Sequence, residues 1–151
     1  MGYARHRLER VRLMSGLASI QRLVWRGGLL FEGEDSWGHR VAISGEQASD
    51  GAKPSDLLPL SLAACLSYDV VEVLRKKRQA LDTLEVTVRS EQEDVSPRRF
   101  VRIALRFEVG GDVDLVAARR ALELAEKHCP VLATVAPTVE VETAIEVTPP
   151  S

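Results

Sequence analysis

Residues 54–78 carry the hydrophobic pattern around which the chain is organised, and this pattern predicts one long helix. The first half, residues 57–66, has no polar face, so we expect it to be buried on every side, in a core or a subunit interface. From Tyr68 onward, apolar positions follow one helix face and charged residues follow the other. A helix of this length spans about 36 Å, close to the width of a small domain. The other segments are therefore expected to wrap around it.

Local signals predict where this helix begins and ends. Ser55 and Asp56 favour an N-terminal cap, and Pro54 disfavours any earlier helix. Pro59 lacks a backbone N–H, so we expect a short first turn and a restart of the helix at Pro59. Basic residues at 76–78 complement the negative end of the helix dipole.

Short strands are predicted on the N-terminal side of the helix, at residues 23–25, 29–32 and 40–44. Glycine-containing segments at 26–28 and 35–38 are typical of the turns between them. Strands joined by such tight turns predict an antiparallel meander.

Alternation of apolar and polar residues predicts half-buried strands on the other side, at 84–91, 101–109 and 138–147. The first two of these form a hairpin, which Gly110 and Gly111 are expected to end.

Two further helices are predicted before the last strand. Asp112 or Asp114 caps a helix that runs through His128, and Pro130 opens a short helix for which Cys129 is the cap.

This order of elements favours the α+β class over a wound parallel sheet, because strands and helices are partly segregated. The central helix is too apolar for a lone domain with one sheet, so we expect a second copy to cover part of it, in a homodimer. We expect a single domain over residues 20–148. Residues 1–19 form a basic extension that either frays or binds a partner, and Met14 is an alternative start.

Composition bounds the function further. The chain has 151 residues, 45% hydrophobic and 28% charged, which suits one globular domain. A net charge of −2 gives no electrostatic case for nucleic-acid binding. Asp69, Glu72 and Pro59 interrupt the apolar run, so no membrane span is predicted. No signal peptide is apparent, and we expect a cytoplasmic protein without a cofactor.

The candidate chemistry rests on the two cysteines, which are too few for a disulfide framework. Cys129 at a helix N-terminus would have its thiolate favoured, whereas Cys65 in mid-helix would be a poor thiolate unless folding brings a cation to it. The alternative is that both are simply buried, inert thiols. Neither cysteine has a metal-ligand spacing to His39 or His128, so no metal site is expected.

The chain resembles the OsmC family, the osmotically inducible and organic-hydroperoxide-resistance proteins. The resemblance is carried by Pro-Ser-Asp-Leu-Leu at 54–58, Ala-Ala-Cys at 63–65 and Cys-Pro-Val at 129–131. The order of elements agrees from about residue 20 to 147, and residues 67–79 are similar to the OsmC-like branch rather than to the peroxidases. The resemblance implies an intertwined α+β homodimer, with antiparallel sheets wrapped around the central helix and the two cysteines meeting near the interface.

The resemblance also implies a mechanism. Cys65 attacks the peroxide and becomes a sulfenic acid, Cys129 closes a disulfide, and a dithiol reductant such as a lipoyl protein resets the pair. An arginine, either Arg26 or Arg40, and a carboxylate would hold Cys65 as thiolate. The chain departs from the peroxidase pattern here, because Ser55 stands where those members have glutamate and the acid, Asp56, comes one residue later.

Two functions remain open from the sequence. The first is a thiol peroxidase that reduces organic hydroperoxides at a site walled by Leu58, Leu62 and residues of a second chain. The second is a non-enzymatic member that binds an apolar small molecule or senses redox state, with the ion network around the thiol lost. For Asp56, the alternative to a catalytic role is a helix cap.

Overall fold

The computed structural model describes residues 18–150 of the chain. The chain forms two compact units, residues 1–54 and 55–151. Most of the predicted extension at 1–19, and Met14 with it, lies outside the described residues. The single domain predicted for 20–148 stays a prediction.

The first unit contains a three-stranded antiparallel sheet of β1 (Arg22–Trp25), β2 (Leu30–Glu34) and β3 (Arg40–Ser44), in the order β1-β2-β3. The predicted meander is confirmed. The register pairs Trp25 with Phe31 and Phe31 with Ile43. Because side chains alternate across a strand, these apolar residues share one face, while Glu32, Glu34 and Arg40 share the other.

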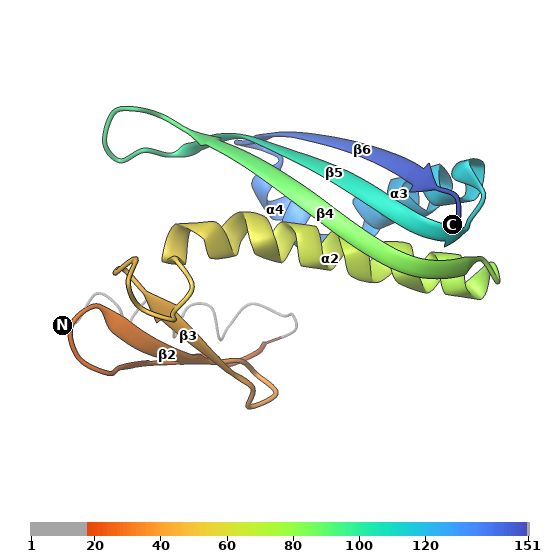
Figure 1. The fold of residues 1–151 in the computed structure, drawn as a ribbon. Helices are drawn as coiled ribbons and strands as arrows, with labels where there is room; N and C mark the ends of the chain where they lie inside the picture. The colour runs from red at the N-terminus through yellow and green to blue at the C-terminus, as the bar shows by residue number, and fades with distance from the viewer. Residues whose placement is uncertain (1–17, 151) are drawn as a thin grey trace. The chain divides into compact units, whose positions relative to one another are not determined.

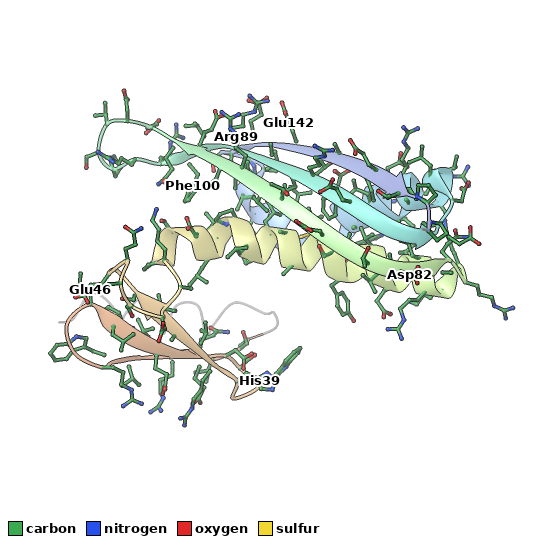
Figure 2. All side chains as sticks on the ribbon, in the orientation of Figure 1. His39, Glu46, Asp82, Arg89, Phe100 and Glu142 are labelled. Atoms are coloured by element: carbon green, nitrogen blue, oxygen red, sulfur yellow. The ribbon has the colours of Figure 1, made fainter. Side chains whose placement is uncertain are left out.

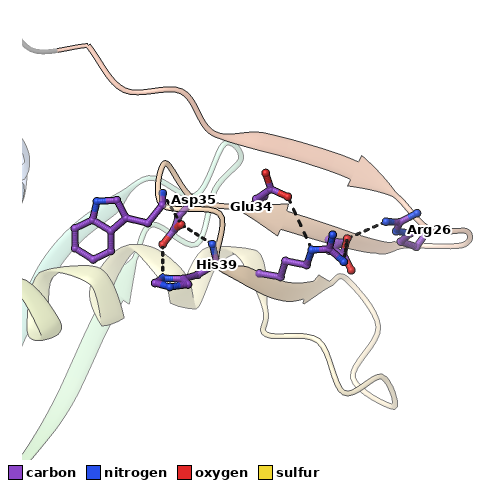
Figure 3. Close-up of polar contacts among 7 residues, drawn as sticks. Arg26, Glu34, Asp35 and His39 are labelled. Atoms are coloured by element: carbon purple, nitrogen blue, oxygen red, sulfur yellow. Dashed lines mark hydrogen bonds and ion pairs between the residues drawn. The ribbon is translucent and has the colours of Figure 1, made fainter.

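The turn between β2 and β3 is built around Asp35, whose carboxylate accepts hydrogen bonds from the backbone N–H groups of Trp37 (2.9 Å) and His39 (2.8 Å), as Figure 3 shows. The Trp37 side chain is 84% exposed and meets the His39 ring edge-on, with centroids 6.1 Å apart. An aspartate at this position satisfies the turn's own backbone, which is the physical basis of the turn signal in the sequence.

The second unit is organised around α2 (Pro54–Lys76), which is one continuous helix. It begins at Pro54, ahead of the predicted cap, so Ser55 and Asp56 lie in its first turn rather than before it, where the charge of Asp56 suits the positive end of the helix dipole. Pro54 occupies the first helical position, where a missing N–H costs nothing. The predicted restart at Pro59 is wrong. The helix tolerates the one backbone hydrogen bond lost there because Pro59 is itself buried. Tertiary packing stabilises a helix in a protein more than local propensity does.

Only one face of α2 is fully buried in the described chain. Leu62, Leu66, Val70 and Leu74 are buried at helical spacing, whereas Leu60 is 54% exposed and Tyr68 is 69% exposed. The expectation of burial on every side therefore holds for the core-facing side alone. By length and composition alone, α2 is long and apolar enough to cross a membrane, and the prediction that it does not span one stays a prediction. A core helix meets the same criterion.

A second sheet, with the order β4-β5-β6, packs on α2. β4 (Ala80–Gln92) and β5 (Phe100–Asp112) form the predicted antiparallel hairpin, while β6 (Glu140–Thr148) runs parallel to β5. Parallel pairing requires a crossover, which the intervening helices provide. Figure 1 shows α2 along one face of this sheet, with α3 (Leu115–His128) and α4 (Pro130–Val135) on the same side.

Gly110 and Gly111 do not end the hairpin, contrary to the prediction. They continue β5 and pair with Thr83 and Leu81, across a register shift in β4. Gly111 has φ +126°, and a Cβ there would collide with the Ala80 carbonyl oxygen. Glycine is therefore needed for the strands to approach this closely. In the sequence, a glycine with this role looks the same as a glycine that forms a turn.

The core of the second unit lies between the sheet and the three helices. It joins Leu62, Leu66 and Val70 of α2 to Phe107 of β5 and Leu122 of α3. The opposite face of the sheet is polar, and Figure 2 shows Arg89 and Glu142 on the side away from α2. Arg102 and Glu142 form an ion pair of 2.6 Å across β5 and β6. The sheet thus has one face buried by helices and one face covered by charged side chains.

Candidate redox site

The two cysteines come from separate elements of the second unit. Cys65 lies in the middle of α2, among core-facing residues. Cys129 lies between two helices: it is the C-cap of α3 and the N-cap of α4. The predicted cap position of Cys129 and the predicted start of the short helix at Pro130 are both confirmed, because proline sets the geometry of a first helical residue and pushes its predecessor into an extended conformation.

The fold brings the two sulfurs together. The Sγ atoms of Cys65 and Cys129 are 3.0 Å apart, although 64 positions separate the residues in the sequence. Both thiols are free. A disulfide requires about 2.05 Å between its sulfurs, so closing this bond takes a movement of about 1 Å.

The environments of the two thiols differ. Cys129 is buried, at 1% exposure, and its Sγ accepts a hydrogen bond of 3.3 Å from the backbone N–H of Leu132 in the first turn of α4. Cys65 is partly exposed. The pair therefore has one partly exposed cysteine and one buried cysteine, which suits a first and a second participant in a thiol–disulfide cycle.

The surroundings of Cys65 disfavour its thiolate. Burial, followed by the hydrogen bond to Cys129, raises the pKa of the Cys65 thiol to about 11, and the negative charge of Asp69 acts in the same direction. A hydrogen bond from the Val131 backbone opposes these effects. This agrees with the expectation that Cys65 is a poor thiolate unless a cation is brought to it.

Both candidate arginines lie in the first unit and are engaged by one carboxylate, Glu32. The Arg26 guanidinium is 2.8 Å from the Glu32 carboxylate. The Arg40 guanidinium lies 3.8 Å from Glu32 and 3.9 Å from Glu34, which is labelled with Arg26 in Figure 3. The hydrogen bond from Arg26 is the main cause that lowers the pKa of Glu32. Sequence reasoning missed Glu32. Glu32 and Glu34 share a face of β2 by alternation, and the pairing of Glu34 with Arg40 puts Arg40 on that same face of the sheet. A role for either arginine at Cys65 stays a prediction.

Asp56 shares α2 with Cys65 but cannot reach it within one chain. Nine residues separate them, which on an α-helix is about 14 Å along the axis and half a turn around it. Any direct contact between this carboxylate and a Cys65 thiol would therefore come from a second copy of the chain. The role of Asp56 in the site stays a prediction.

The site offers few groups to a metal. Among residues 18–150, there is no group of three or more His, Cys, Asp or Glu side chains placed to hold a metal ion. The chemistry that the described pair offers is that of two adjacent free thiols.

Comparison with known proteins identifies the family. Residues 45–144 match the family model described as OsmC-like protein. The chain is also 34% identical over 128 residues to Protein YhfA of Escherichia coli strain K12, a match that covers 83% of this chain and 96% of that protein. The chain belongs to the OsmC-like protein family. The resemblance inferred from the sequence motifs is thereby confirmed.

Solved structures support the fold of this OsmC-like protein. A hypothetical protein from Aquifex aeolicus VF5 is 25% identical and superimposes with a TM-score of 0.80 over 89% of this chain and 98% of that one. An organic hydroperoxide resistance protein from Elizabethkingia anophelis is 19% identical, with a TM-score of 0.65 over 89% of this chain and all of that one. The predicted α+β class with a central helix is confirmed; the first sheet is antiparallel as predicted, whereas the second is mixed because β6 runs parallel to β5.

Proposed function

We propose that this OsmC-like protein is a thiol-dependent peroxidase that reduces organic hydroperoxides through Cys65 and Cys129. The observation that carries the proposal is the 3.0 Å separation of the two Sγ atoms, one from a partly exposed cysteine and one from a buried cysteine. A family relationship to proteins of hydroperoxide resistance is consistent with it.

The cycle follows from the chemistry of two adjacent thiols. The Cys65 thiolate attacks an oxygen of the hydroperoxide, the O–O bond breaks, and the alkoxide takes a proton and leaves as an alcohol. Cys65 is then a sulfenic acid. The Cys129 sulfur attacks it, an S–S bond forms, and the oxygen leaves as water. A dithiol reductant, such as a lipoyl protein, exchanges with the disulfide and restores both thiols.

The thiolate needed for the first step requires a cation, because the environment within one chain raises the pKa of Cys65. We infer that assembly supplies this cation in a homodimer, with Arg26 as the guanidinium and Glu32 as the group that orients it. An exposed apolar stripe on α2, formed by Leu60, Ala64 and Tyr68, supports a dimer, since a contiguous apolar surface on a helix favours a protein partner.

A titration with cumene hydroperoxide tests the proposal. One equivalent added to the reduced protein is expected to consume both thiols and leave an intramolecular disulfide, measured by a thiol assay and by a loss of two hydrogens in the intact mass. Cys65→Ser should abolish peroxide consumption. Cys129→Ser should stop at a sulfenic acid that dimedone traps. If both thiols stay titratable, or if Cys65→Ser consumes peroxide like the wild type, the enzyme proposal is wrong.

A second candidate is a non-enzymatic member that binds an apolar small molecule or senses redox state. The raised pKa of Cys65, with the negative charge of Asp69 close to it, favours this alternative. A sensor would form the disulfide in a redox buffer but would not turn over peroxide with excess dithiothreitol. Sustained turnover under those conditions therefore separates the two candidates. For either one, the cytoplasm, where cysteine pairs are usually transient, is the compartment we propose.

A further inference from the structure

Besides undergoing thiol–disulfide chemistry, the reduced Cys65–Cys129 pair presents two soft sulfur ligands to a metal or metalloid centre. The two Sγ atoms are 3.0 Å apart, and both thiols are free. In the described part of the chain, no third His, Cys, Asp or Glu side chain completes a metal-binding group with them. Thiol ligands select soft, thiophilic centres over hard cations. A matching centre would need two sulfurs from the protein and no more.

The ligand number disfavours the usual metal ions, because the described part of the chain offers the two sulfurs and no third His, Cys, Asp or Glu ligand beside them. Tetrahedral zinc takes four ligands at about 2.3 Å for sulfur, which places two of its sulfurs about 3.8 Å apart. A linear two-coordinate ion such as Hg²⁺ holds its sulfurs on opposite sides, farther apart still. Trivalent arsenic is pyramidal, binds two sulfurs at a narrow angle, and brings its own third substituent. A pair of close thiols therefore completes its coordination.

We propose that the reduced Cys65–Cys129 pair is a chelating site for trivalent arsenic compounds, both arsenite and organoarsenicals. Cys65 is partly exposed and Cys129 is 1% exposed, so the arsenic centre binds Cys65 first and Cys129 second. The first turn of α4 holds the Cys129 sulfur in place through the Leu132 N–H, at 3.3 Å. This preorganisation reduces the cost of forming the second bond.

The reaction is a condensation without electron transfer. For a compound with one organic group and two hydroxyls on arsenic, two S–H bonds and two As–O bonds break. Two As–S bonds form, and the hydroxyls leave as two molecules of water. Arsenic stays trivalent and the sulfurs keep their oxidation state. No peroxide or reductant takes part, so the arsenic-site proposal can be tested independently of the proposed peroxidase cycle.

Phenylarsine oxide, added to the reduced full-length protein, tests the site. We expect one phenylarsine per chain in the intact mass, with the loss of both titratable thiols. A dithiol, 2,3-dimercaptopropanol, should remove the adduct, whereas glutathione at the same thiol concentration should not. Cys65→Ser and Cys129→Ser should each bind at least about 10²-fold more weakly, because the second bond is then missing.

Wild-type protein oxidised to its disulfide is the matched control and should take up no arsenical. If a serine variant does not fold, this control tests the need for both thiols without any substitution. The proposal is overturned by two arsenicals per chain, by loss of a single thiol, or by removal of the adduct with glutathione alone. Unchanged affinity in a folded Cys129→Ser variant would overturn it equally. These measurements contain no peroxide, so a protein that binds the arsenical but does not reduce cumene hydroperoxide would contradict only the proposed function.

Discussion

At the scale of single residues, Cys65 shows how its surroundings determine the reactivity of a thiol. Burial and the adjacent Cys129 raise its pKa to about 11, so within one chain it is protonated at neutral pH. A raised pKa means that the thiolate appears only as the pH approaches that value, and below it the reactive fraction falls about tenfold per pH unit. Peroxidase activity near pH 7 therefore depends on a charge that the single-chain environment does not supply.

The arginine that supplies this charge can be identified from the pH dependence of Cys65 alkylation. If Arg26 faces the thiol in the dimer, the wild-type midpoint lies well below 11, and Arg26→Ala shifts it upward toward that value. Arg40→Ala is the comparison variant, because Arg40 is the other candidate and its guanidinium also pairs with Glu32. The measurement is the rate of iodoacetamide modification at Cys65 from about pH 6 to about pH 11, a range that contains the ordinary thiol pKa and reaches the raised value of about 11. Equal profiles for Arg26→Ala and the wild type would exclude Arg26, and a shift in Arg40→Ala alone would assign the role to Arg40.

At the scale of elements, α3 and α4 hold the second sulfur in place. Asp114 caps α3 by accepting a hydrogen bond of 2.8 Å from the Ala117 N–H, and Cys129 forms the junction at the other end. Because α4 begins directly at Pro130, the position of the Cys129 sulfur depends on where α3 ends. The geometry of the thiol pair is thus a property of helix termini.

Removing the cap of α3 has a predictable cost. Asp114→Ala should lower the free energy of unfolding by about 1 kcal/mol, within the usual range of about 0.5–2 kcal/mol for the loss of an N-cap. The measurement is urea denaturation followed by circular dichroism. Asp112→Ala is the control, since this residue was the other candidate for the cap and lies at the end of β5. An equal loss in both variants would show that the effect is not capping.

At the scale of the whole molecule, the exposed side of α2 is the feature that the single chain leaves unexplained. Its apolar stripe of Leu60, Ala64 and Tyr68 lies on the same helix as Cys65. The first sheet also carries large exposed apolar side chains, at Leu23, Trp25 and Val41. Both features agree with the proposed homodimer, in which a second copy covers surface that would otherwise face water.

The oligomeric state is therefore expected to depend on the stripe. In sedimentation experiments, the wild type should have twice the 16.6 kDa mass of one chain, and the double substitution Leu60→Glu and Tyr68→Glu should give single chains. Val95→Glu is the matched control, because Val95 is also apolar and 70% exposed but lies in the hairpin loop of the second sheet. A wild type that is monomeric at micromolar concentration would remove the basis for the dimer and for a cation from a second copy.

Much of the fold followed from local pattern. A short strand segment after a glycine-containing turn predicted β3 at the bounds that the structure has, and the Cys-Pro junction predicted the start of α4. The errors arose where tertiary packing overrides a local signal. Pro59 predicts an interruption of the helix, but packing in the core keeps α2 continuous through it. Gly110 and Gly111 predict the end of the strand pair, but they allow β4 and β5 to come close. The parallel pairing of β6 has no local signature, because alternation is the same in either orientation.

The sequence by itself determined the elements, the family and the two cysteines as the candidates for chemistry, because these depend on periodicity, caps and short motifs. Only the tertiary structure decided that the sulfurs lie 3.0 Å apart, that one is shielded, and that Asp56 lies away from Cys65 along its own continuous helix. It also revealed Glu32 as the partner of both arginines. The physical reason is that a thiol's pKa and its distance to a second thiol are set by groups remote in sequence, which come together only when the chain packs.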